Sequence, residues 1–190
     1  MRELTYYIGM TLDGFIAGPH DEVDFYPLAD DHSAHMNDAY PEVLPTHVRR
    51  AIGLDDVPNR GFDTVVMGRR TYVPALEAGI TSPYAHLRQI VVSRSMDVSP
   101  DLAVELVRQD PRGRIRELKA EDGLGIYLAG GGRLAGELLP DIDRLIVKKY
   151  PVVAGSGLPA FAADFAPVQF ALEEALTFSN GCAVLRYHRR

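Results

Sequence analysis

Tryptophan is absent from this chain of 190 residues, and cysteine occurs once, at Cys182. A single cysteine excludes an intramolecular disulfide and is typical of a reducing compartment, so we expect the protein in the cytoplasm. No apolar run approaches the roughly 18 residues that a membrane-spanning helix needs, and the first residues lack the apolar segment of a secretory signal. We therefore expect no membrane partner.

Positive charge is also in short supply. The chain has 20 Lys and Arg against 26 Asp and Glu, a formal net charge of −6. Nucleic-acid phosphates are bound by clustered Lys and Arg, so nucleic acid is not an expected partner. The histidines His20, His32, His35 and His47 match no zinc-binding spacing, and no metal site is predicted. The 46% hydrophobic and 24% charged fractions are ordinary for a globular protein, and the length predicts a single domain over residues 1–190.

Short apolar runs alternate with helical patterns along most of the chain. Strands are predicted at residues 4–10, 64–67, 89–93, 102–107, 126–129 and 145–150, and helices at 45–52, 72–78, 115–120 and after the glycines at 130–132. Residues 20–45 are polar and interrupted by prolines, which disfavours a long helix there. Two segments flanking residues 179–181 predict a C-terminal antiparallel hairpin. The fold class is therefore α/β, with a mainly parallel central sheet.

The segment 126–140 joins a predicted strand to a predicted helix through three consecutive glycines. Glycines at such a junction let a phosphate approach the backbone, and the start of the helix offers free N–H groups. The spacing Gly130-x-Gly132-x-x-Ala135 fits the loose dinucleotide fingerprint, although glycines that only tighten a turn would look the same. A standard Rossmann fold carries this motif in its first βα turn and an acidic residue after the next strand. Neither condition holds here, which disfavours that fold.

Polar residues follow two further predicted strands. Gly68–Thr71 follows the strand at 64–67, and Ser93 and Arg94 end the strand at 89–93. Because the carboxyl ends of parallel strands meet at one edge of a sheet, we expect these segments to lie beside the glycine turn. A single arginine there would be interpreted as a solvated surface charge. Three such strand ends in one chain instead predict a site for a phosphorylated cofactor, because guanidinium groups match phosphate geometry.

These motifs, at 64–72, 90–94 and 127–132, resemble in their order those of the dihydrofolate reductase superfamily. The segments 12–17 and 155–159 are similar to one branch, which contains the C-terminal reductase domain of bacterial riboflavin biosynthesis proteins and stand-alone relatives. The resemblance covers nearly the whole chain. It implies a three-layer α/β/α sandwich, a reductase that uses NADPH, and a homodimer, for which residues 168–172 and 183–187 could supply the contact.

The resemblance also implies which residues hold the cofactor. Gly68, Arg69, Arg70 and Thr71 would cradle phosphate, with Arg69 or Arg70 near the 2′-phosphate, and Ser93 and Arg94 would flank the same group. Gly130, Gly131, Gly132, Arg133 and Leu134 would hold the pyrophosphate, and Met10 and Ala17 would frame the nicotinamide through backbone groups. We expect NADPH rather than NADH, because no acidic residue adjoins these arginines, whereas an NAD site usually offers a carboxylate to the ribose.

The substrate region departs from a folate reductase, which usually presents a tryptophan after its opening loop and an acidic residue early in its first helix. This chain has no tryptophan, and Asp24, Asp30, Asp31 and Asp38 lie in the proline-interrupted region as expected surface residues. Dihydrofolate is therefore not the expected substrate. Asp13, in a glycine-flanked loop after the first strand, is the candidate catalytic carboxylate; alternatively, it stabilises its own turn.

Two functions remain open from the sequence. The first is an NADPH-dependent reductase of a ribosylated aminopyrimidine or similar heterocycle, resembling 5-amino-6-(5-phosphoribosylamino)uracil reductase. The second is a non-catalytic nucleotide-binding protein that kept the cofactor site and lost the substrate site. Deamination, which a fused zinc domain often performs in that pathway, is excluded because the chain lacks the cysteine pairs of such a domain.

Overall fold

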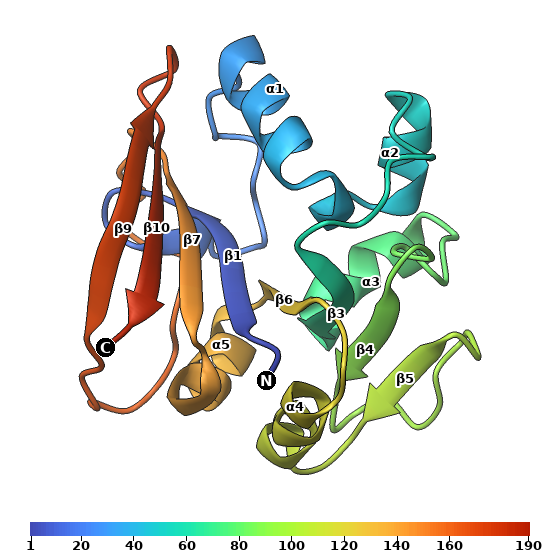
Figure 1. The fold of residues 1–190 in the computed structure, drawn as a ribbon. Coiled ribbons are helices and arrows are strands. Elements are labelled where there is room, and N and C mark those ends of the chain that lie inside the picture. The colour runs from blue at the N-terminus through green and yellow to red at the C-terminus, as the bar shows by residue number, and fades with distance from the viewer.

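A computed structural model describes residues 1–190. One sheet holds the strands in the order β5-β4-β3-β6-β1-β7-β10-β9 (Figure 1). Its strands are β1 (Leu4–Met10), β3 (Phe62–Gly68), β4 (Arg88–Val92), β5 (Val104–Val107), β6 (Gly125–Gly130), β7 (Arg144–Lys149), β9 (Phe170–Thr177) and β10 (Ala183–Arg189). The pairs from β5 through β7 are all parallel, while β10 pairs antiparallel with both β7 and β9. The predicted mainly parallel sheet and terminal hairpin are confirmed.

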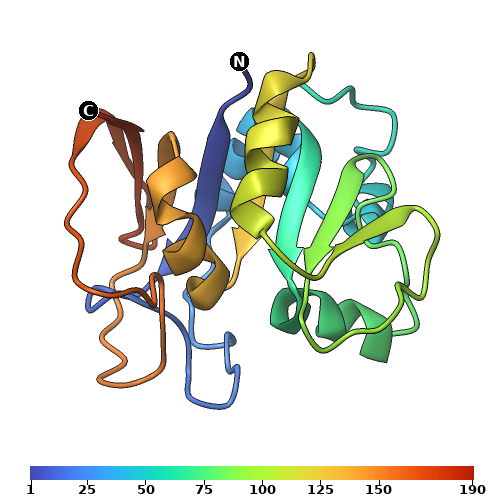
Figure 2. The ribbon, with the colours of Figure 1, turned by 90° about the horizontal axis from the view of Figure 1, so that it is seen from below.

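Helices cover both faces of this sheet. They are α1 (Asp30–Ala39), α2 (Thr46–Ala51), α3 (Arg69–Glu77), α4 (Pro111–Ala120) and α5 (Gly132–Leu138), with short 3-10 turns at Pro41–Val43 (η1) and Leu139–Asp141 (η2). Successive side chains of β1 point to opposite faces. Tyr6 packs in the cluster of Leu118 and Leu138 from α4 and α5, whereas Tyr7 packs with Met36 of α1 and Tyr72 of α3. Figure 2 shows α4 and α5 in front of the sheet and α1 behind it, which confirms the three-layer sandwich.

Helix α1 was not predicted. Prolines bracket it rather than interrupt it, since Pro27 precedes and Pro41 follows its 10 residues. The structure also places a second, two-stranded sheet where a loop was expected: β2 (Phe15–Ala17) pairs antiparallel with β8 (Leu158–Pro159). Short strands of this kind depend on a distant partner, so the local sequence carries little indication of them.

Asp31 fastens α1 to the C-terminal hairpin. Its carboxylate accepts hydrogen bonds from the backbone N–H of Ser179 at 2.9 Å and from the Ser179 hydroxyl at 2.8 Å. These hydrogen bonds hold the pKa of Asp31 below its usual value. Asn180 donates its side-chain amide to the carbonyl of Pro27 at 2.9 Å, just before the helix. Asp31 is exposed, as expected, but it binds the hairpin turn rather than solvent alone.

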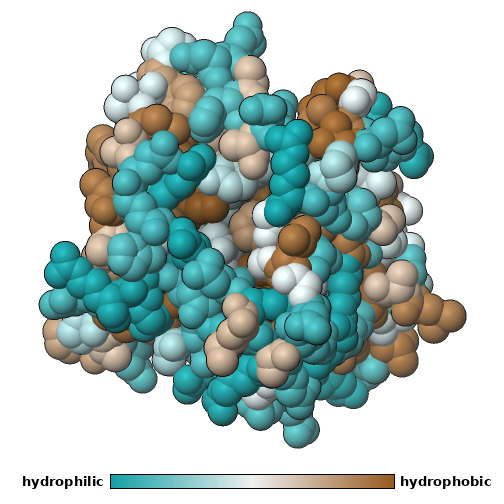
Figure 3. Space-filling view, viewed as in Figure 1, coloured by the Kyte–Doolittle hydropathy of each residue, from teal (hydrophilic) through white to brown (hydrophobic).

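The outer surface carries most of the charge. Figure 3 shows the side seen in Figure 1 largely covered by hydrophilic residues, with apolar residues in patches between them. Cys182, which lies just before β10, is fully buried. None of the helices has the length and apolar character needed to cross a bilayer.

Candidate functional site at the carboxyl edge of the sheet

The carboxyl ends of β4, β3, β6 and β1 lie next to one another, because these parallel strands are neighbours in the sheet. The end of β3 lies close to the turn that follows β6. A Cβ built on Gly68 would lie 3.6 Å from both the Gly130 carbonyl oxygen and the Gly131 nitrogen. The loops coloured blue and orange in Figure 2, from residues 18–29 and 150–166, extend beyond this edge. The structure therefore brings the three predicted strand ends together.

The three glycines of the turn differ in what they permit. Gly130 has a φ of +115°, which favours glycine. A Cβ on Gly132 would lie 1.9 Å from the carbonyl oxygen of Pro159, so no side chain fits there. Gly131, which follows a cis peptide bond, has a φ of −91°, and its Cβ would meet only the Thr71 hydroxyl, at 3.9 Å. Gly131 is therefore the one glycine of the turn that combines an ordinary φ with room for a side chain.

The arginines at this edge have acidic partners that the linear sequence does not show. Arg70 pairs with Asp21 from the blue loop at 2.7 Å, and Arg94 of the β4 end approaches Glu137 of α5 at 3.5 Å. The prediction that no acidic residue adjoins these arginines is therefore wrong, because the acids come from distant parts of the chain. Both pairs are solvent-exposed, and exposed ion pairs contribute only about 0–1 kcal/mol, so a phosphate dianion can compete for either arginine.

The other residues predicted to contact phosphate differ in whether their side chains are free to reach a ligand. The buried Ser93 hydroxyl accepts the backbone N–H of Met96 at 3.1 Å and of Ser95 at 3.3 Å, which shapes the turn that carries Arg94. Arg69 donates to the Ser95 hydroxyl at 3.2 Å. Arg133 is exposed on α5, whereas the neighbouring Leu134 side chain is buried in the core, so only its backbone could contact a ligand.

Met10 is the last residue of β1, and Ala17 is the last residue of β2. Both are buried, and Met10 packs with Val147 and Ala160. The Ala17 carbonyl oxygen would lie 2.2 Å from a Cβ on Gly157, so the 155–159 loop passes directly over β2. Because both side chains are buried, any contact of these residues with a nicotinamide would be made by their backbone, and that role stays a prediction.

Asp13 binds this same loop. Its carboxylate accepts hydrogen bonds from the Thr11 hydroxyl at 2.6 Å and from the backbone N–H groups of Ala154 at 3.1 Å and Gly155 at 2.7 Å. The Thr11 hydroxyl and these N–H groups hold the pKa of Asp13 at about 2. A carboxylate that stays ionised at neutral pH cannot supply a proton there. The contacts favour the second alternative, stabilisation of the loop.

We expect Asp13→Ala to release the 154–155 segment. Hydrogen exchange of the Ala154 and Gly155 amides should accelerate by roughly tenfold, because each loses an acceptor that carries charge. In the wild type this protection is present above the ordinary carboxyl pKa and should be lost as the pH falls through about 2. Unchanged exchange in the variant would show that the loop does not depend on Asp13.

One cationic side chain near this edge was not singled out from the sequence. Lys148 lies in β7, opposite Gly9 of β1 in the strand register, and its Nζ sits 4.5 Å from the centre of the Tyr7 ring. The sequence contains a sign of this residue, because Lys148 directly follows the apolar run Leu145–Val147 within β7. A lysine beside such a run is unusual, because removing its ammonium group from water costs free energy.

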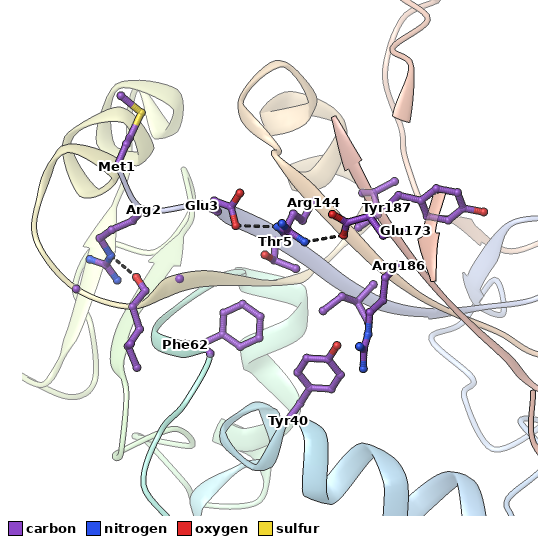
Figure 4. A pocket seen from close by; sticks show the side chains of 16 residues that line it. Met1, Arg2, Glu3, Thr5, Tyr40, Phe62, Arg144, Glu173, Arg186 and Tyr187 are labelled. Carbon is purple, nitrogen blue, oxygen red and sulfur yellow. Dashed lines mark hydrogen bonds and ion pairs between the residues drawn. The ribbon is translucent and has the colours of Figure 1, made fainter. Parts of the chain in front are cut away.

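A cavity of about 520 Å³ opens at the opposite, amino edge of the sheet. Figure 4 shows Arg144 between Glu3 and Glu173, to which it binds at 2.7 and 2.6 Å, with the rings of Tyr40 and Phe62 on the other side. The charge of Arg144 is thus balanced within the protein. This cavity lies away from the strand ends that carry the predicted cofactor residues.

No family model matches the chain. Two proteins of Bacillus subtilis (strain 168) are similar in sequence, both named only as uncharacterized. YwjB is 29% identical over 162 residues, covering 84% of this chain and 83% of its own length. YyaP is 26% identical over 200 residues, covering 98% and 95%.

Three solved structures are similar in fold. The "Putative riboflavin biosynthesis protein" of Shewanella sp. PV-4 has a TM-score of 0.72 at 22% identity and covers 99% of both chains. The diaminohydroxyphosphoribosylaminopyrimidine deaminase/5-amino-6-(5-phosphoribosylamino)uracil reductase of Thermotoga maritima has a TM-score of 0.64 at 16% identity; the match covers 100% of this chain and 57% of that one. Dihydrofolate reductase of Enterococcus faecalis, complexed with NADP(H), has a TM-score of 0.63 at 14% identity, with 99% and 96% covered.

These likenesses confirm the fold that the motifs implied. The chain has the fold of dihydrofolate reductase, which it shares with the riboflavin-pathway deaminase/reductase. The arrangement of a mostly parallel sheet with a C-terminal antiparallel pair of strands agrees with this assignment.

Proposed function

We propose that this protein is an NADPH-dependent oxidoreductase that transfers a hydride to a small heterocyclic substrate. The observation that carries the proposal is the meeting of three strand ends at one sheet edge, where Gly131 leaves the backbone uncovered beside Thr71. Arg69, Arg70 and Arg94 lie on the same edge, in exposed positions. The Enterococcus faecalis reductase, which shares the fold, was solved with NADP(H).

The residues present suit such a cofactor. The Gly131 backbone would face the pyrophosphate, and Arg70 and Arg94 would bind the 2′-phosphate in place of Asp21 and Glu137. The cofactor supplies the hydride, while the protein contributes binding and orientation. Thr71 would donate its hydroxyl to a phosphate oxygen. Asp13, through Ala154 and Gly155, would keep in place the loop that passes over β2.

For the substrate we propose a ribosylated aminopyrimidine or a related heterocycle. The support is the shared fold with the Thermotoga maritima protein, whose name includes 5-amino-6-(5-phosphoribosylamino)uracil reductase. Dihydrofolate is the less favoured substrate. Helix α1 begins with Asp30 and Asp31, but Asp31 is held by Ser179, and the chain has no tryptophan.

A fluorescence titration with NADPH, followed by assays of NADPH oxidation with reducible heterocycles, tests this proposal. We expect saturable NADPH binding and oxidation that depends on one of the heterocycles. Tight binding with no oxidation by any acceptor would favour the alternative, a non-catalytic nucleotide-binding protein. Absence of NADPH binding would overturn both functions.

We also propose a homodimer. The segments expected to form its contact, 168–172 and 183–187, lie largely in β9 and β10, which complete the sheet of the monomer. The outer edge of β9 has no strand beside it, and Leu172 in β9 is 55% exposed. We expect sedimentation equilibrium at micromolar concentration to give twice the chain mass of 20.9 kDa. A single species of the monomer mass would refute the dimer.

A further inference from the structure

The sheet separates between β1 and β6 before β1 ends. β1 pairs with β6 only as far as Tyr6, opposite Leu128, whereas it pairs with β7 as far as Met10. β6 meanwhile stays paired with β3 up to Gly130. The last four residues of β1 therefore have no strand beside them on the β6 side. This opening lies between the end of β1 and the glycine turn, the two places proposed for the nicotinamide and the pyrophosphate.

The backbone carbonyl of Gly9 points toward this opening. In a parallel strand, the backbone groups of successive residues form hydrogen bonds to opposite sides. The carbonyl of Glu3, directly before β1, accepts the N–H of Ile126 in β6 at 2.8 Å, whereas the Met10 carbonyl accepts the N–H of Tyr150, directly after β7, at 2.9 Å. Because Gly9 is an even number of residues from Glu3, its carbonyl faces the side from which β6 has departed.

The Tyr26 hydroxyl joins β1 to β2 at this point. It donates to the carbonyl oxygen of Phe15 at 3.1 Å and to that of Gly9 at 3.4 Å. Gly9 directly precedes Met10 at the end of β1, and Phe15 begins β2, which ends at Ala17. One hydroxyl thus links the ends of the two strands whose backbone is proposed to frame the nicotinamide.

The Tyr26 side chain is itself held in place. Its ring packs against the rings of Phe25 and Tyr150, with 4.5 Å between the ring centres in each pair. The chain directly after it is fixed as well, because the Pro27 carbonyl accepts the side-chain amide of Asn180 at 2.9 Å. Burial raises the pKa of Tyr26 to about 12, so the hydroxyl stays a donor at neutral pH. A side chain fixed in this way can set the position of the groups that it binds.

We infer that Tyr26 is a positioning residue for the nicotinamide ring of the cofactor. This inference rests on the proposed function. By binding the carbonyls of Gly9 and Phe15 together, the hydroxyl holds the end of β1 and β2 as one rigid wall of the opening beside β6. Tyr26 acts through this backbone and takes no part in the transfer of the hydride. A small displacement of the ring lowers the rate of hydride transfer steeply, because the reacting atoms must be close and aligned.

Tyr26→Phe tests this role, because it removes the hydroxyl and keeps the ring. Calorimetric titrations would compare NADPH with adenosine 2′,5′-bisphosphate, which has the adenosine and the 2′-phosphate but no nicotinamide. We expect the Kd for NADPH to rise by about fivefold to tenfold, the effect of losing one neutral hydrogen bond. The Kd for the bisphosphate should stay within about twofold of the wild-type value, because this ligand does not reach the end of β1.

Tyr72→Phe is the matched control. The Tyr72 hydroxyl also donates to a backbone carbonyl, that of Thr81, and the side chain is fully buried. Thr81 lies in the connection between α3 and the start of β4. We expect this variant to lose at least as much thermal stability as Tyr26→Phe and to bind both ligands like the wild type. The comparison separates a loss of stability from an effect on the nicotinamide.

Turnover gives a second measure of the position of the ring. With the acceptor that the wild type reduces fastest, we expect Tyr26→Phe to lower kcat by about tenfold and to leave the KM for the acceptor unchanged. The kinetic isotope effect with NADPH deuterated at the transferred position should increase, because a misplaced ring makes hydride transfer the slow step.

The outcomes that would overturn the inference differ from those that would overturn the proposed function. Equal changes in Kd for NADPH and the bisphosphate, or no change in either, would refute the positioning role. Tighter binding of NADPH by Tyr26→Phe would refute it too, because the hydroxyl would then occupy the place of the ring. In each of these cases the wild type still binds NADPH, and the proposed function stands. A wild type that does not bind NADPH would refute both.

Discussion

Gly131→Asp is expected to abolish NADPH binding, with a loss of more than about a hundredfold in affinity, while the protein still folds. In the proposed site the backbone of Gly131 faces the pyrophosphate. A side chain at this position occupies the space of the ligand, and a carboxylate adds repulsion between like charges. The structure offers this side chain room, since its Cβ would meet only the Thr71 hydroxyl, at 3.9 Å.

The stability of the same variant separates binding from folding. Gly131 precedes α5 at the N-cap position and has a φ of −91°, and aspartate is a favoured N-cap residue. We therefore expect a thermal midpoint close to that of the wild type. A turn glycine with positive φ would instead lose stability on substitution, so that any loss of binding would follow from unfolding.

Gly132→Ala is the matched control. Its Cβ would lie 1.9 Å from the Pro159 carbonyl oxygen, so this variant should lose thermal stability although alanine adds no charge. Measuring melts and NADPH titrations on the same samples distinguishes the two positions. If folded Gly131→Asp protein binds NADPH with wild-type affinity, the cofactor site is assigned to the wrong residues.

Arg70→Ala and Arg94→Ala are each expected to weaken NADPH by about tenfold to a hundredfold and to leave NADH nearly unchanged. The 2′-phosphate is the only group that distinguishes the two cofactors, and it is dianionic near neutral pH. Loss of a charged hydrogen-bond partner costs about 1.5–3 kcal/mol. The competing pairs with Asp21 and Glu137 favour the lower end of this range, because the phosphate must displace a carboxylate.

Arg88→Ala provides the control for these arginines. Arg88 begins β4, whereas Arg94 follows its carboxyl end, and Arg88 forms its own pair with Glu121 at 2.7 Å. Its removal changes the net charge equally but at the opposite edge of the sheet. We expect both cofactors to bind Arg88→Ala like the wild type. Equal losses for NADPH and NADH in Arg70→Ala and Arg94→Ala would show that they do not recognise the 2′-phosphate.

Much of the fold could be predicted from local patterns. The strand predicted at 4–10 coincides with β1, and the strands and helices around the three strand ends were placed within a few residues. These elements have strong periodicity and buried apolar runs, which depend on nearby residues alone. Helix α1 was missed because its proline-bracketed, polar segment has only two buried residues, His32 and Met36. Its packing against the hairpin depends on Ser179, far along the chain.

The sequence by itself determined the class of the fold and the strand ends that form the candidate site. Only the tertiary structure decided what each residue can do there. It showed that Gly131 is open while Gly132 is enclosed, and that Arg70 pairs with Asp21. It also joined Asp13 to Gly155 and left Lys148 without a carboxylate. The physical reason is that neighbours in a parallel sheet are distant in the chain, so the space and charge around a side chain arise from segments that its local sequence does not contain.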